Sequence, residues 1–374
     1  MTVLTRRIIL AIVVLAIIGV IAAIELAKPH VSATEVTTPG LASSSPAVQD
    51  VVASKAEVYP RAIELADPTG FINAAPFTIQ SLIGKKVILI DFWTYSCINC
   101  QRTIPYLNAW YAKYKDYGLV IIGIHSPEFG FEKVYDNVKE AVERAGITYP
   151  VVLDSAMATW TAYKNLYWPR EYLIDIDGFI VHDHIGEGGY QETEDAIRHA
   201  LIERAQRLGL ATSTIPGGYV TPAGALTPNG VNSPETYFGA MRNEYFGNGT
   251  PGQVGTSTFS VPQTLALNHF YLGNQWAIKQ EYAQSASAGA SVTYEYDATD
   301  VYLVASDPLG ARVEVLLDGK PIPDAMAGDD VSGGILTVKE DRLYSIVKGA
   351  SPGVHTLELK SDQPGLEIYT FTFG

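Results

Sequence analysis

Apolar and polar positions alternate in two different ways along the chain. Val87–Phe92 is a short apolar run rich in β-branched residues, which predicts a buried strand. Soon after it, apolar residues between Ile104 and Tyr114 recur at helical spacing. The cysteines Cys97 and Cys100 lie between the two patterns. The sequence therefore predicts a strand that leads into a helix N-terminus, with both cysteines at the junction.

Residues 59–210 continue with mixed helix and strand patterns. We expect further strands at 119–124 and 149–153, helices at 134–145, 157–167 and 197–208, and a β-hairpin formed by 171–176 and 179–184. Strands that alternate with helices, followed by a hairpin and a last helix, are typical of a mixed sheet that is covered on both faces. Residues 59–210 are therefore predicted to form one α/β domain.

From residue 235 onward helical patterns are absent. Short alternating runs predict strands at 270–272, 292–296, 301–305, 313–317, 356–360 and 367–373. Short strands separated by turn signals are typical of a β-sandwich, which we expect at 235–374. Tyr237, Phe238, Trp276 and Tyr282 are candidates for a sugar-stacking surface, although aromatic residues at strand positions more often pack in a core.

Three segments lie outside these two domains. Residues 1–28 contain the uncharged run Ile8–Ile24 after two arginines, and about 17 residues is the lower limit for a membrane-spanning helix. We expect an uncleaved anchor that leaves the rest of the chain outside the cell, with signal-peptide cleavage near Ala33 as the alternative. Residues 29–58 predict a flexible tether, and residues 211–234 a linker rich in Gly, Pro and Thr.

The charge balance narrows the class of partner. Among 374 residues, 40 acidic and 26 basic side chains give a net charge of −14. This excess of acid argues against nucleic acid and against an anionic membrane surface as the main partner. It fits a domain in the extracytoplasmic space.

Cys97 and Cys100 are the only cysteines of the chain. Unpaired N–H groups and a partial positive charge at a helix N-terminus favour a thiolate, so Cys97 is the candidate nucleophile. Cys100, one turn further along, can attack a mixed disulfide formed at Cys97. A structural zinc site is disfavoured because it needs four ligands. This chemistry requires no metal and no organic cofactor, only the redox-active Cys97–Cys100 disulfide.

Three further residues are candidates for the same site. Asp91 lies within the apolar run, where a carboxylate is costly unless it has a partner or a function, and it is placed to take the proton of Cys100. Pro169, at the start of a strand, is a candidate cis proline. Glu128 follows a strand end and is either a proton donor or acceptor near the thiols or a solvated loop acid.

Together these residues resemble the thioredoxin-like superfamily, of redoxin or TlpA-like type. The segments FWTYSCINCQRTIPYLNAWY, IHSPEFGFEK, GITYPVVLD and TWTAYKNLYWPREYLID resemble the extracytoplasmic part of DipZ-type proteins, and the resemblance spans roughly residues 71–374. It implies a thioredoxin-like domain in which Trp93 and Trp168 support the site, followed by a jelly-roll similar in fold to carbohydrate-binding modules. DipZ-type proteins also carry a CcdA-like membrane domain. This sequence has one apolar segment instead, so we expect a separate CcdA-like electron donor.

Other classes of function stay open at this point. His182 and His184 have strand spacing, and with the CxxC pair they suggest copper delivery as in Sco-like proteins, although those use CxxxC. A peroxiredoxin is disfavoured because Ile90 stands where that family has a proline. A glycan- or cell-wall-binding protein with an accessory thioredoxin-like domain is the main alternative. The preferred hypothesis is a single-pass, membrane-anchored thiol–disulfide oxidoreductase on the extracytoplasmic side, acting on protein thiols and disulfides.

Overall fold

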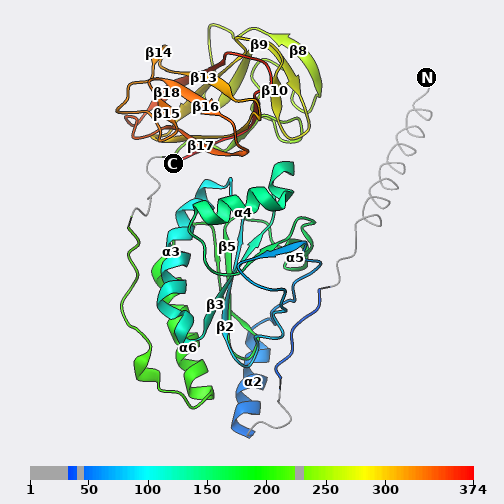
Figure 1. Cartoon of the computed structure of the whole chain (residues 1–374), viewed down its shortest axis with the longest axis vertical. Helices are drawn as coiled ribbons and strands as arrows, with labels where there is room; N and C mark the ends of the chain where they lie inside the picture. The colour runs from blue at the N-terminus through cyan, green and yellow to red at the C-terminus, as the bar shows by residue number, and fades with distance from the viewer. Residues whose placement is uncertain (1–32, 40–45, 224–230) are drawn as a thin grey trace, which may run out of the picture.

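The computed structural model describes residues 33–39, 46–223 and 231–374, which form an α/β domain and an all-β domain stacked on it (Figure 1). The anchor predicted at residues 1–28 lies outside these ranges. Within them, no helix combines the length and the apolar character needed to cross a bilayer.

A six-stranded sheet forms the centre of the α/β domain, in the order β1-β4-β3-β2-β5-β6. The strands are β1 (Gly70–Ile72), β2 (Val87–Trp93), β3 (Leu119–His125), β4 (Val151–Leu153), β5 (Arg170–Ile174) and β6 (Ile180–Ile185). Strands β2, β3 and β4 are parallel to one another, and β1, β5 and β6 pair antiparallel. All of β2 is buried because both faces of the sheet are covered, which explains why its sequence is apolar except at Asp91.

Helices α3, α4 and α6 supply the apolar residues that cover one face of this sheet. The helical elements of the domain are α3 (Ile98–Tyr114), η2 (Lys115–Tyr117), η3 (Gly130–Lys133), α4 (Tyr135–Arg144), α5 (Ala158–Ala162), α6 (Tyr190–Arg207) and η4 (Thr212–Thr214). The helix predicted at 157–167 is shorter than expected. Lys164 takes a left-handed conformation after α5, and the aromatic pattern there comes from Trp160 and Tyr163 packing on Phe92.

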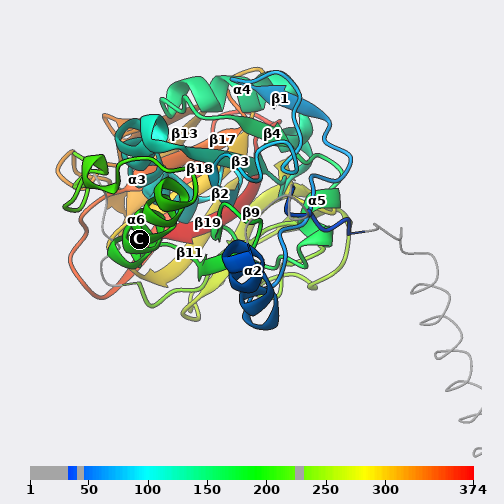
Figure 2. The same ribbon diagram turned by 90° about the horizontal axis from the view of Figure 1, so that it is seen from below.

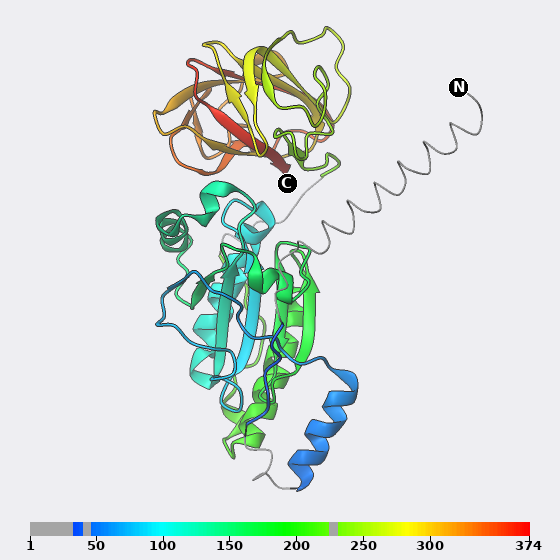
Figure 3. The same ribbon diagram turned by 90° about the vertical axis from the view of Figure 1, so that its right-hand side faces the viewer.

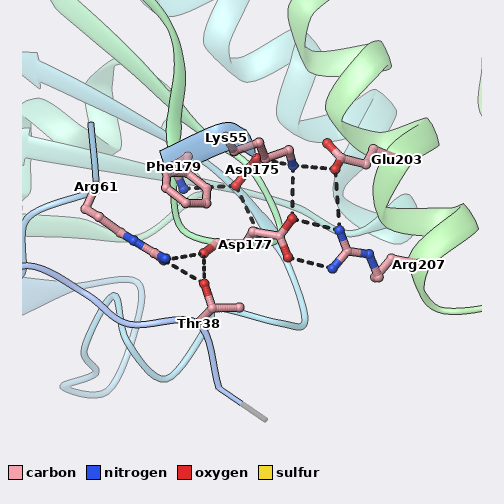
Figure 4. Close-up of polar contacts among 8 residues, drawn as sticks. All are labelled: Thr38, Lys55, Arg61, Asp175, Asp177, Phe179, Glu203 and Arg207. Atoms are coloured by element: carbon pink, nitrogen blue, oxygen red, sulfur yellow. Dashed lines mark hydrogen bonds and ion pairs between the residues drawn. The ribbon is translucent and has the colours of Figure 1, made fainter. Parts of the chain in front are cut away.

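The segment predicted to be a flexible tether at 29–58 contains a helix, α2 (Pro46–Val58), and two buried valines, Val36 and Val52. Lys55 of α2 places its Nζ 2.6 Å from Asp175 Oδ2 and 3.0 Å from Asp177 Oδ2, and it also bonds Glu203 (Figure 4). Over 33–39 and 46–58 the prediction was wrong, because the Ala- and Ser-rich composition shows neither the ionic attachment of Lys55 nor the burial of Val36 and Val52.

This attachment, the Lys55 cluster (Lys55, Asp175, Asp177, Glu203 and Arg207), lies at the end of the domain remote from the cysteines. β5 runs antiparallel to β2 and pairs its last residue with the start of β2, whereas the cysteines follow the other end of β2. In Figures 1 and 3, α2 lies at the end of the α/β domain that faces away from the β domain. Figure 2 looks at the molecule from that end.

The all-β domain contains antiparallel strands in two sheets that share one long strand. Its strands are β7 (Thr236–Tyr237), β8 (Gly255–Phe259), β9 (His269–Ile278), β10 (Ala283–Ser285), β11 (Ser291–Asp297), β12 (Val301–Ser306), β13 (Ala311–Leu317), β14 (Lys320–Pro321), β15 (Val331–Ser332), β16 (Ile335–Val338), β17 (Arg342–Val347), β18 (Val354–Ser361) and β19 (Glu367–Phe373). The first half of β9 pairs with β11 and its second half with β8 and β10. The β-sandwich architecture is confirmed, and the finer jelly-roll connectivity stays a prediction.

One sheet of the sandwich covers the cysteine end of the α/β domain. Strands β12, β17 and β19 place one set of side chains in the sandwich core and the opposite set against the α/β domain. The apolar part of the contact consists of Ile98 and Phe129 on one side and Tyr302, Val304, Leu343 and Tyr369 on the other. The two domains therefore meet directly beside the CxxC pair.

Candidate active site

The two cysteines lie where the sequence places them, at the junction of β2 and α3. Cys97 is the N-cap of α3, and its Sγ accepts a hydrogen bond from the backbone N–H of Cys100 at 3.3 Å. This N–H is one of those that a helix N-terminus leaves unpaired, and it stabilises negative charge on Cys97. Cys97 is half-buried, whereas Cys100 is buried. Burial raises the pKa of Cys100 well above its ordinary value, and the neighbouring Cys97 adds to this. One thiol thus faces the surface and the other is held behind it.

A buried glutamate fixes the loop that carries Cys97. The Glu132 carboxylate accepts hydrogen bonds from Ser96 Oγ at 2.6 Å, from the Ser96 N–H at 3.2 Å and from the Phe129 N–H at 3.0 Å. Burial raises the pKa of Glu132 above its ordinary value. Sequence analysis missed this residue, because an acid in a polar loop shows no sign of burial before its partners are known.

Asp91 is buried as predicted, with 1% of its surface exposed. It is paired across the sheet with Gly123 on β3 and with Glu171 on β5. Burial, and after it the charge of Glu171, raises the pKa of Asp91 well above its ordinary value. Asp91 in turn contributes to the raised pKa of Cys100. The predicted position of a proton acceptor behind Cys100 is therefore occupied by a buried carboxyl whose pKa is raised.

The predicted supporting aromatics take different positions. Trp93 is buried at the end of β2 and meets the ring of His125 edge-on. Trp168 donates from Nε1 to the Ser126 carbonyl oxygen at 3.0 Å. The Trp168–Pro169 peptide bond is cis, which confirms the prediction for Pro169. Trp168 and Cys97 line the same cleft, whereas Trp93 does not.

This cleft lies between the two domains and has a volume of about 280 Å³. The α/β domain contributes Cys97, Ile98, Asn99, Glu128, Leu166, Tyr167 and Trp168, and the β domain contributes Glu235, Tyr237, Arg242 and Thr372. Ile98 also lines a larger interdomain cavity of about 410 Å³, which does not reach either sulfur. Access to Cys97 is therefore shaped by both domains, a feature that sequence analysis did not predict.

Glu128 lies in the wall of this cleft rather than free in a loop. Its Oε1 lies 2.6 Å from Arg242 Nη1 and 2.8 Å from the hydroxyl of Tyr237. The guanidinium of Arg242 lies 3.6 Å above the ring of Tyr237. These contacts make Glu128 a link between the domains at the edge of the cleft, with its carboxylate already paired.

The residues proposed for other functions do not gather at the site. Trp276 and Phe238 lie in the core of the sandwich, and Tyr237 and Tyr282 pack near the domain contact, so these four do not form a sugar-stacking surface. Among the described residues, the one group of His, Cys and acidic side chains compact enough for a metal is Asp175, Asp177 and Glu203. Lys55 and Arg207 occupy that group (Figure 4), and neither His182 nor His184 belongs to it.

A mixed α/β sheet with a CxxC pair at a helix N-terminus and a cis proline beside the same cleft defines a thioredoxin-like protein. Residues 63–183 match the AhpC/TSA family, and residues 233–374 match a family described as a thioredoxin-like C-terminal domain. A solved thioredoxin-like protein in the oxidized form has 30% identity and a TM-score of 0.34, covering 36% of this chain and 90% of that chain.

Similarity to known proteins identifies the family to which the chain belongs. The chain is 31% identical over 140 residues to the thiol–disulfide oxidoreductase YkuV of Bacillus subtilis, which covers 37% of this chain and 93% of the relative. It is 40% identical over 325 residues to protein DipZ of Mycobacterium bovis, covering 86% of this chain and 44% of the relative. The chain thus spans less than half the length of the DipZ proteins that it matches. It belongs to the thioredoxin-like family of thiol–disulfide oxidoreductases.

Proposed function

We propose that this protein is an extracytoplasmic, membrane-anchored thiol–disulfide oxidoreductase that exchanges electrons with protein disulfides through Cys97 and Cys100. The observation that carries the proposal is the unequal placement of the two thiols, with Cys97 at the cleft and Cys100 buried one turn behind it. A nucleophile that is accessible and a resolving thiol that is protected from the substrate are what a two-step exchange needs.

Two thiolate attacks make up the proposed reaction. The Cys97 thiolate attacks one sulfur of the substrate disulfide, which forms a mixed disulfide and releases the first substrate thiolate. Cys100 then attacks Sγ of Cys97, which releases the second substrate thiolate and leaves the Cys97–Cys100 disulfide. Two electrons pass from the protein to the substrate, and the reverse sequence oxidises a substrate dithiol.

Localisation and the electron donor belong to the same proposal. The uncharged run Ile8–Ile24 after Arg6 and Arg7 supports an N-terminal anchor with the domains outside the membrane. A reductase in that position needs electrons from across the membrane, and a separate CcdA-like protein is the proposed donor. Two fusions test the orientation, one to a reporter that is active only outside the cytoplasm and one to a reporter that is active only inside it. With the reporter after residue 374, the proposal expects activity from the first fusion and none from the second.

The exchange reaction is tested with the full-length protein in detergent and insulin as the protein disulfide. We expect Cys97→Ser to abolish insulin reduction, and Cys100→Ser to accumulate a mixed disulfide that is visible on a non-reducing gel. Glu140→Gln, an exposed position on α4, is the control and should reduce insulin at the wild-type rate. Insulin reduction that survives Cys97→Ser would overturn the proposal.

The direction of electron flow is a separate measurement. Equilibration of the Cys97–Cys100 pair against thiol buffers gives its reduction potential. A potential near the value of about −270 mV for thioredoxin would indicate a reductase, and one near about −120 mV would indicate an oxidant that introduces disulfides.

A further inference from the structure

A row of ionisable residues crosses the sheet on the face that packs against α3. Asp91 on β2 is paired directly with Glu171 on β5, and Glu171 is paired directly with His184 on β6. Residues paired in this way point to the same face of a sheet, with their Cβ atoms about 5 Å apart. The row starts in the buried region next to Cys100 and ends on β6, the edge strand of the sheet.

The inner part of this row is buried, and one oxygen of each carboxyl has no hydrogen-bond partner among the described residues. Asp91 and Glu171 have 1% and 2% of their surface exposed. Oδ1 of Asp91 and Oε2 of Glu171 have no hydrogen-bond partner among the described residues. Two facing carboxylates in a buried site cannot both be ionised, but a single proton between them satisfies both. Their pairing on adjacent strands and their burial therefore favour a state in which the two carboxyls together hold one proton.

Gly123 leaves space for two hydrogen-bond donors, Trp93 Nε1 and the Tyr149 hydroxyl, near the Asp91–Glu171 pair. Gly123, on the other side of Asp91, lies so close to Trp93 and Tyr149 that an added Cβ would be 2.9 Å from Trp93 Nε1 and 3.2 Å from the Tyr149 ring. Trp93 Nε1 and the Tyr149 hydroxyl are buried and have no partner among residues 33–39, 46–223 and 231–374. Burial, and after it the charges of Asp91 and Glu171, raises the pKa of Tyr149, so its hydroxyl is a neutral donor beside the two carboxyls.

The outer part of the row leads towards solvent. The hydroxyl of Thr193 on α6 bonds Glu171 and lies 3.2 Å from His182 Nε2. His182 and His184 are half-buried on the edge strand. Burial, and after it His184, lowers the pKa of His182, whereas Asp183 on the same strand and Glu192 on α6 act in the opposite direction. Glu187, in the loop after β6, is paired with Arg102 of α3.

We propose that Glu171 shares a proton with Asp91 and passes it to His182 and His184, so that the buried Cys100 exchanges protons with solvent through the edge of the sheet. The proposal rests on thiol–disulfide exchange at Cys97 and Cys100. When Cys100 attacks the mixed disulfide, its thiol proton goes to the Asp91–Glu171 pair and leaves through the histidines. The departing substrate thiolate takes its proton from solvent, and in the reverse direction the same path returns a proton to Cys100.

Glu171→Gln tests the inner half of the path. The rate at which the wild-type mixed disulfide resolves is measured by rapid mixing between pH 5 and pH 9. Because burial raises the pKa of Glu171 to about 7, the wild-type profile should bend near that pH. We expect Glu171→Gln to slow the resolution of the mixed disulfide at least about tenfold and to remove the bend from the pH profile. Glu171→Asp, which keeps a carboxyl, should restore part of the rate and of the bend. Glu140→Gln is again the control. An unchanged pH profile in Glu171→Gln would overturn the relay.

The double variant His182→Gln and His184→Gln tests the outer half and covers the case in which Glu171→Gln does not fold. Resolution should be slower, and added imidazole should restore the rate because it replaces the missing proton carriers. No slowing, or slowing that imidazole does not reverse, would count against the relay. These outcomes are distinct from failure of the proposed function, in which the wild-type protein itself would not reduce insulin.

Discussion

Glu132 shows how one side chain sets the position of the reactive loop. Its carboxylate binds the backbone of Ser96, directly before Cys97, and the backbone of Glu128 and Phe129 in the next loop. We expect Glu132→Ala to lower the free energy of unfolding by roughly 3 kcal/mol, because it leaves several buried N–H and O–H donors unpaired. Urea unfolding measures this. Glu132→Gln, which keeps one carbonyl oxygen, should lose less, and equal losses in the two variants would contradict the explanation.

The raised pKa of Glu171 predicts how the stability of the protein depends on pH. Burial raises this pKa from 4.5 to about 7, so the folded state holds a proton that the unfolded chain has already released. Since the folded state then binds more protons, stability must fall as the pH rises through this window. We expect Glu171→Gln to be more stable than the wild type above pH 7, by about 3 kcal/mol at most, and to show no advantage near pH 4. Thermal unfolding of both proteins from pH 4 to pH 8 checks this sign.

Sequence reasoning found the residues whose signal is local. Cys97 and Cys100 lie where the apolar pattern changes from that of a strand to that of a helix, and Asp91 interrupts an apolar run. Each can therefore be recognised in the sequence before its contacts in the fold are known. Glu171 is the second residue of β5, and Glu132 lies in the short 3-10 helix η3. Their burial depends on strand pairing and on loop contacts, neither of which the sequence shows.

At the scale of the element, α2 is attached by charge more than by apolar packing. Burial lowers the pKa of Lys55, but hydrogen bonds to Asp175 and Glu203 outweigh it, and the pKa lies above its ordinary value. Removing this lysine leaves Asp175 and Asp177 buried with Arg207 as the remaining cation. We expect Lys55→Met to destabilise the domain by about 2 kcal/mol and to speed hydrogen exchange in α2. Lys139→Met, an exposed position on α4, is the control and should change neither.

The predicted elements of the α/β domain were confirmed where the apolar pattern repeats over many residues or where turn-forming residues mark a hairpin. Helix α3 and the β5–β6 hairpin around Asp177 and Gly178 belong to this group. The prediction failed at α2, where the attachment depends on Lys55 and the buried Val52, and it was too long at α5, which ends at Ala162.

At the scale of the whole molecule, the contact between the domains depends on outward-facing aromatic residues of the sandwich. The ring of Tyr369 lies 5.1 Å from Phe129 and 4.9 Å from Phe131, centre to centre. We expect Tyr369→Ala to cost about 3 kcal/mol and to expose Ile98, so that limited proteolysis cuts between residues 211 and 234 sooner. Leu309→Ala, an exposed position in the sandwich, is the control. A wild-type cleavage rate in Tyr369→Ala would show that the aromatic contact does not hold the domains together.

The docking of the domains could not have been predicted from the sequence. Both faces of β12 and of β19 are buried, one in the sandwich core and one against the α/β domain. The nearly continuous apolar sequence of β12 indicates burial but not what covers each face, and the buried threonines of β19 show no sign of burial in the sequence. The predicted sandwich was therefore confirmed, while its part in shaping the cleft at Cys97 required the structure.

The Lys55 cluster lies about 20 Å from the cysteines, since the length of β2 separates the two. Helix α2 is thus fixed to the domain at the end opposite the cleft, whereas residues 33–36 lie along the side of the domain beside residues 62–64 (Figure 1). A substrate protein that docks at the cleft to reach Cys97 would therefore contact the β domain and leave α2 uncovered at the far end.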